Sequence, residues 1–85
     1  MINKKQIGIV LHFFSKISVA VVKLTDNIKV GDKISFESEE KKVEQVVDSM
    51  QIDNKQIEEA GTGQEIAIKV NESVRTGIKV FKIEE

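Results

Sequence analysis

The sequence predicts a small all-β domain, a closed six-stranded antiparallel-type β-barrel. Runs rich in β-branched and aromatic residues recur along the chain and are separated by short polar links. Glycine opens three of the runs in one repeated form: glycine, two residues, then a β-branched residue. The 85 residues suffice for one compact core, so we expect residues 1–85 to form a single barrel domain.

The first two strands are predicted at residues 7–14 and 17–24 as a hairpin. Both runs are rich in β-formers, and only Ser15-Lys16 separates them, which is hairpin spacing. Phe13 and Phe14 are neighbours, so in a strand they point to opposite faces. One of them can fill the barrel while the other lies outside it or at its open end.

The middle strands follow from the repeated glycines. Gly31, Gly63 and Gly77 each precede a β-rich run, the later runs being residues 66–70 and 78–83. Glycine takes positive φ without steric cost, so each is expected to form a tight turn that leads into a strand.

Residues 42–50, KVEQVVDSM, admit two interpretations. Val43, Val46, Val47 and Met50 have the spacing of a helix face, and Ser38 could cap such a helix. The β-branched residues and the flanking strands instead favour a strand with a bulge near residues 48–49, which is the interpretation we adopt. We expect residues 54–60 to form a loop with a helical turn.

Charge is unevenly distributed along the chain, although the net charge is −1. Residues 1–36 carry +4, residues 37–72 carry −6 and the last thirteen residues carry +1. Both ends could build one basic side that meets phosphate, or the charges could simply be solvated. Cysteine is absent and no apolar run is long enough to cross a membrane, so we expect a cytoplasmic protein without a membrane partner.

No residue pattern predicts catalysis, a metal or a cofactor. His12 is the only histidine, and the adjacent glutamate pairs lie in polar segments, where enclosure is not expected to shift their pKa values. Phe14, beside His12 and Lys16, could stack a base or anchor a partner, or it could only cover the barrel end. Arg75 is the only arginine, and its planar fork suits a carboxylate or a phosphate.

The segments IKVGDKISF, VVDSMQIDNKQIEEAGTGQEIAIKV and VRTGIKVFKI resemble the second domain of translation GTPases, the β-barrel of elongation factor Tu and its relatives. The opening GIVLHFFSKISVAVVKL is similar to small free-standing elongation-factor-like proteins. The resemblance covers residues 6–83. A phosphate-binding G-x-x-x-x-G-K-[ST] motif is absent, so no nucleoside triphosphate is expected.

The resemblance implies a non-catalytic binding module that associates with RNA or ribosome-associated factors. In elongation factor Tu the loop after the methionine strand helps to hold the aminoacyl end of tRNA, and the matching loop here begins at Gln51. The expected partner-binding residues are therefore His12, Phe14, Lys16, Gln51 and Arg75. The alternative is a protein–protein interaction module, because the same kind of barrel accompanies some collagenase-like peptidases.

Overall fold

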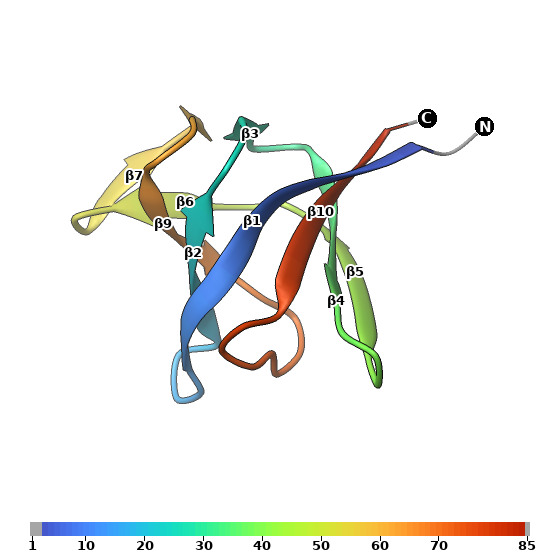
Figure 1. Cartoon of the computed structure of the whole chain (residues 1–85). Helices are drawn as coiled ribbons and strands as arrows, with labels where there is room; N and C mark the ends of the chain where they lie inside the picture. Colours follow the sequence, from blue (N-terminus) through green and yellow to red (C-terminus); the bar gives the residue numbers. More distant parts are fainter. Residues whose placement is uncertain (1–2, 85) are drawn as a thin grey trace.

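The computed structural model describes residues 3–84, which form an all-β domain (Figure 1). Its strands are β1 (Asn3–Phe14), β2 (Val19–Leu24), β3 (Ile28–Lys29), β4 (Lys33–Glu37), β5 (Lys42–Val46), β6 (Met50–Ile52), β7 (Lys55–Ile57), β8 (Glu59–Ala60), β9 (Glu65–Lys69) and β10 (Lys79–Glu84). The described part of the chain contains no helix. The predicted all-β class is confirmed.

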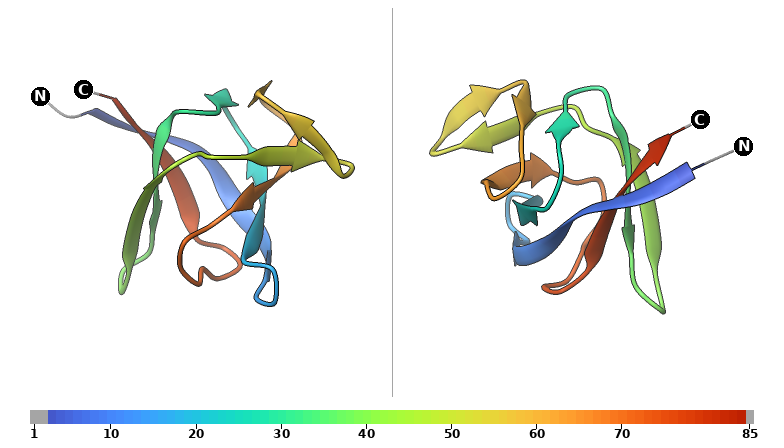
Figure 2. Two further views of the ribbon diagram at one scale, coloured as in Figure 1. Left: turned by 180° about the vertical axis from the view of Figure 1, so that it is seen from behind. Right: turned by 45° about the horizontal axis from the view of Figure 1, so that its top comes forward.

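Most of the strands form one curled sheet rather than the predicted closed six-stranded barrel. Eight strands pair in the order β5-β4-β10-β1-β2-β9-β6-β7, and β3 pairs separately with β8. All these pairs are antiparallel. Within residues 3–84 no backbone ladder joins the end strands β5 and β7. Figure 2 shows the sheet wrapping around its interior while the β6–β7 hairpin projects to one side.

A buried side chain connects the end strand β5 to the end of β9, which lies two strands in from the other end of the sheet. The amide Nε2 of Gln45, on β5, donates a hydrogen bond to the Lys69 carbonyl oxygen at 2.9 Å. Its Oε1 accepts one from the Asn71 backbone N–H, also at 2.9 Å. Gln45 is only 6% exposed, so both bonds are shielded from water. One side-chain amide thus connects β5 to the end of β9.

Residues 42–50 are extended, as predicted, but they form parts of two strands. β5 pairs with β4, whereas β6 pairs with β7 and β9. The interruption at residues 47–49 lies where the bulge was expected, and Val47 and Met50 are both buried. Val46 is 48% exposed, so the four apolar residues do not share the single face that a helix would require.

The repeated glycines have the backbone conformation that the sequence predicts. Gly31, Gly63 and Gly77 have φ values of 98°, 88° and 91°. A Cβ atom at these positions would meet nothing within 4 Å, so conformation rather than space favours glycine. Gly8 is different, because a Cβ there would lie 2.7 Å from the Lys23 carbonyl oxygen. β1 and β2 approach closely at that point.

Two predicted connections are wrong. The first hairpin turn spans residues 15–18 instead of two residues, because Ser18 takes a left-handed conformation with φ of 54°. Residues 54–60 form β7 and β8 rather than a helical turn. Asp53 and Asn54, with φ of 51° and 65°, form the two-residue turn between β6 and β7.

The core lies inside the curled sheet and draws on nearly every strand. Its largest fully buried side chains are Phe36, Ile7, Leu24, Ile28, Ile34, Met50, Ile66 and Ile68. Phe13 is partly buried and packs against this cluster, whereas Phe14 is 46% exposed. The expectation that the two phenylalanines face opposite ways is therefore confirmed.

Candidate partner-binding surface

His12 and Phe14 lie together on the outside of β1. Their ring centroids are 4.5 Å apart, and the ring planes are tilted by 59°. A β-bulge precedes them: Val10 pairs with Val22 and His12 pairs with Val21, so Leu11 is the extra residue of β1. The bulge leaves Leu11 37% exposed beside His12.

Because of the strand register, the apolar outer surface of β1 continues across β2, β9 and β6. His12 is opposite Val21, Val21 is opposite Ala67, and Ala67 is opposite Gln51. Residues directly opposite each other in a sheet project from the same face. The next row contains Phe14, Val19 and Lys69. We call the outer side of β1, β2, β9 and β6 the hairpin face, made of His12, Phe14, Val19, Val21, Gln51 and Ala67.

Alternation along the strands confirms that this face points outward. Ala20, Val22, Ile66 and Ile68 are at most 1% exposed and form the inner face of β2 and β9. Their neighbours Val19, Val21 and Ala67 are only partly exposed, because they cover one another on the outside. Both faces of these strands are therefore apolar near the first hairpin.

Four exposed lysines surround the hairpin face: Lys16, Lys23, Lys69 and Lys79. Lys16 belongs to the hairpin turn, and Lys69 lies opposite Val19. Lys23 and Lys79 pair with Ile9 from its two sides. Among residues 3–84, none of the four has a carboxylate oxygen within 4.0 Å. Two of them do have an acidic cross-strand neighbour: Glu65 lies opposite Lys23, and Glu37 lies opposite Lys79.

The sequence-predicted binding residues are therefore only partly brought together. His12, Phe14 and Gln51 share the hairpin face, and Lys16 lies in the turn beside it. Arg75 lies elsewhere, in the connection between β9 and β10.

Arg75 lines a separate open groove between its own loop and the β4–β5 turn. Residues 37–40 form one side of the groove, and Thr76, Lys79 and Phe81 contribute to the other. Figure 1 shows both connections at the end of the domain opposite the chain termini. Among the described residues, the Arg75 guanidinium has no carboxylate oxygen within 4.0 Å.

The carboxylates with altered acidity lie away from the hairpin face. A hydrogen bond from Lys4 holds the pKa of Glu37 below its ordinary value, and one from the Ser35 hydroxyl adds to this. Lys5 likewise lowers the pKa of Asp26, whose carboxylate in turn raises the pKa of Lys5. Lowered values keep these carboxylates ionised, whereas a general acid near neutral pH needs a raised pKa.

Within residues 3–84, His, Asp and Glu side chains form no group of three that could hold a metal ion. A bilayer-spanning helix, long and apolar enough for that role, is likewise not found in this part of the chain.

Sequence reasoning missed the aliphatic members of the hairpin face. Val19, Val21 and Ala67 sit in strands whose alternate residues are also apolar. A signal was available in SVAVV, where consecutive positions are apolar, since a strand with one solvated face alternates with polar residues. Ile17, which is 60% exposed, was missed because it was assigned to a strand instead of the turn.

No protein-family model matches the chain. The chain is 40% identical over 84 residues to the uncharacterized protease MJ0090 of Methanocaldococcus jannaschii. That match covers 98% of this chain and 21% of the protease, so the chain spans about a fifth of the length of the curated relative it matches.

Among solved structures, the C-terminal domain of a Geobacillus thermoleovorans protein described as a U32 peptidase superposes with a TM-score of 0.87. It is 20% identical, and the superposition covers 95% of this chain and 93% of that domain. The selenomethionine variant of the same domain gives a TM-score of 0.81 at 18% identity, covering 95% of this chain and 99% of the variant. At this level of identity the likeness establishes a shared fold.

These comparisons show that the resemblance to the second domain of translation GTPases is wrong. The matching relative is a protease, and the matching fold is a peptidase's C-terminal domain. The glycine turns that suggested elongation factors reflect turn chemistry, which many small β domains use. The expected RNA and ribosome-associated partners depended on that resemblance and lose their support. The findings favour the alternative, an accessory domain of a collagenase-like peptidase.

Proposed function

We propose that this chain is a non-catalytic accessory domain of a collagenase-like peptidase that acts through protein–protein contact. The match that carries the proposal is 40% identity over 84 residues to one fifth of a protease. The fold adds support, because the solved neighbour is itself the C-terminal domain of a protein described as a U32 peptidase.

The chemistry of the side chains agrees with a binding role. The imidazole of His12 contacts the ring of Phe14 on the exterior of the sheet. The carboxylates of Asp26 and Glu37 are tied to lysines, and their pKa values are lowered. The paired carboxylates thus stay ionised within the domain. The exposed apolar residues around Phe14 offer an area that another protein could contact.

A domain exchange tests the proposal. In the Methanocaldococcus jannaschii protease, the matched 84 residues are replaced by this chain, and hydrolysis of a short fluorogenic peptide and of labelled gelatin is measured. We expect the chimera to cleave both substrates at rates within about threefold of the parent protease, since related domains of one fold exchange with little strain. The purified chain alone should cleave neither substrate.

A second chimera with an unrelated β domain of the same size is the matched control, and it should lose activity or solubility. Equal activity of the two chimeras would show that the segment is a passive spacer. Cleavage by the isolated chain would show that the domain is catalytic. Either result would overturn the proposed function.

A further inference from the structure

The hairpin face combines apolar area with a rim of four lysines, of which Lys23 and Lys79 each have a glutamate opposite them on the neighbouring strand. Phe14 is 46% exposed and Ile17 is 60% exposed at the hairpin end of this face. Val21 and Ala67 extend the apolar area across β2 and β9. Exposed apolar patches with a polar rim are typical of surfaces that another protein covers.

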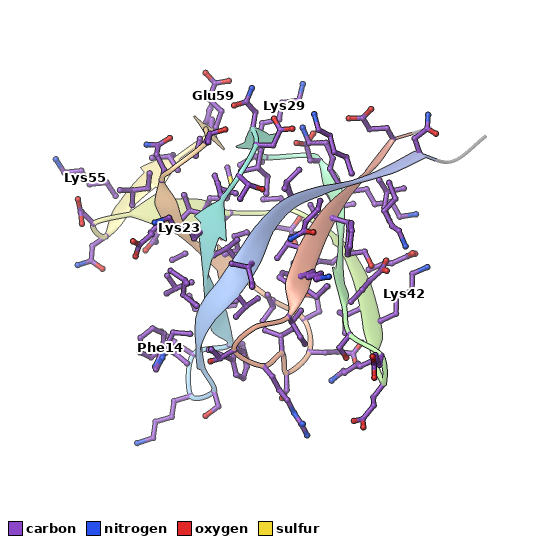
Figure 3. All side chains as sticks on the ribbon, in the orientation of Figure 1. Phe14, Lys23, Lys29, Lys42, Lys55 and Glu59 are labelled. Carbon is purple, nitrogen blue, oxygen red and sulfur yellow. The ribbon has the colours of Figure 1, made fainter. Side chains whose placement is uncertain are left out.

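Four lysines of the domain form ion pairs, whereas the four around this face do not, a property they share with Lys29, Lys33, Lys41 and Lys55 among the described residues. Lys4, Lys5, Lys42 and Lys82 each have a carboxylate partner within the domain. Lys16, Lys23, Lys69 and Lys79 have none within 4.0 Å among the described residues. Figure 3 shows Phe14 and Lys23 on one side of the domain and Lys42 near the opposite edge of the sheet. The partner that complements this face therefore has an apolar centre bordered by Asp and Glu.

The charge pattern disfavours a second copy of this chain as the occupant. A symmetric dimer built on the hairpin face would place the same lysine rim on both partners. Like charges held together at an interface oppose association. The occupant must therefore be a different surface.

We propose that the hairpin face docks against the catalytic portion of the peptidase, through an apolar area there that is bordered by acidic residues. This inference rests on the proposed function. The matched segment accounts for 21% of the protease, so most of that chain remains to supply such a surface. Contacts between domains of one chain commonly take this form, an apolar patch with a polar rim.

Lysine labelling in the active chimera tests the docking. Each lysine is acetylated under limiting reagent in the chimera and in the free 85-residue chain, and the rates are compared by mass spectrometry. We expect Lys16 and Lys69 to react about tenfold more slowly in the chimera, as they would if the docked state were about nine-tenths populated. Lys42, on β5 at the far end of the sheet, should react equally in both proteins.

Two variants of matched exposure provide the control. Phe14→Ser should restore fast labelling of Lys16 and Lys69 in the chimera. Val46→Ser, at a residue 48% exposed on β5, should leave their protection unchanged. Circular dichroism of both variants of the free chain checks that they are folded.

The outcomes separate this inference from the proposed function. An active chimera in which Lys16 and Lys69 react as in the free chain would overturn the docking surface and leave the accessory role intact. An inactive chimera with a folded inserted domain would overturn both. Protection that appears in the free chain as its concentration rises, with a dimer in sedimentation, would identify a second copy as the occupant instead.

Discussion

Two exposed or partly exposed phenylalanines on the outside of the sheet have very different surroundings. Phe81, on β10, lies beneath the ammonium group of Lys4, which is 5.1 Å from the ring centroid. Lys4 Nζ donates to Glu37 Oε1 at 2.8 Å, and Glu37 Oε2 accepts a 2.7 Å hydrogen bond from Ser35. Phe14, on β1, has only the ring of His12 as a recorded aromatic or cationic partner among the described residues.

The two outer surfaces of one sheet thus differ in how many of their exposed rings and lysines have partners within the domain itself. Around Phe81, the Lys4 ammonium lies over the ring and is itself paired with the Glu37 carboxylate. Around Phe14, Leu11 and Ile17 lie exposed, and within residues 3–84 the nearby lysines have no carboxylate oxygen within 4.0 Å. We therefore expect the Phe81 region to matter mainly for the stability of this domain, and the Phe14 region for the partner contact that we propose.

The largest effect is expected where the two halves of the sheet are joined. Gln45→Ala removes both amide hydrogen bonds and leaves the Lys69 carbonyl and the Asn71 N–H without that partner. We expect a loss of about 2–4 kcal/mol in the free energy of unfolding, measured by urea denaturation. Gln56→Ala, at an exposed position of β7, is the control and should cost less than about 0.5 kcal/mol. Equal losses in the two variants would show that the sheet does not depend on this connection.

Phe81→Ala should have the next largest effect, because it removes a partly buried ring together with its contact to Lys4. We expect a loss of about 1–2 kcal/mol in the same denaturation assay. The comparison of the two phenylalanines would fail if this substitution were as mild as removal of the Phe14 ring.

Acid should weaken the Phe81 region through Glu37, whose pKa is lowered in the folded state. A lowered carboxyl pKa stabilises the fold above the unfolded value of about 4.3, and this contribution is lost as the pH falls through the folded value. Glu37→Gln should therefore lower the Tm at pH 6, and the difference from the parent chain should shrink by about pH 3 or below. Added salt should also reduce the difference at pH 6, because Lys4 is partly exposed. A difference independent of pH would assign the effect to packing.

The smallest effect on stability is expected for Phe14→Ala. Its ring is 46% exposed, so the free energy of unfolding should change by about 0.5 kcal/mol or less. Capture of the Methanocaldococcus jannaschii protease lacking its matched 84 residues by the immobilised chain should nevertheless weaken. A large drop in Tm would instead place Phe14 in the core and remove it from the binding surface.

Much of the fold could be predicted from local chemistry. Gly31, Gly63 and Gly77 were expected at positive φ, and their conformations follow directly from the lack of a Cβ atom. The opposite orientation of Phe13 and Phe14 follows from the two-residue period of a strand. These properties depend on a few adjacent residues, so a single sequence contains the information.

The candidate site was predicted only in part, because the strand register decides which of its residues lie next to one another. His12 and Gln51 are far apart in the sequence and share a row only because β2 and β9 lie between them. The one-residue bulge at Leu11 decides which side of β1 the following residues face. Arg75 has suitable chemistry, but its loop places it in another groove.

The sequence alone determined the all-β character, the glycine turns and the lack of any recognisable catalytic pattern, because each depends on residue type and short-range spacing. Only the tertiary structure decided that the described sheet stays open between its end strands, that Gln45 connects β5 to the end of β9, and that one exterior face is apolar with a rim of lysines. These features arise from which strands become neighbours, and strand pairing is set by packing between segments that are distant in the chain.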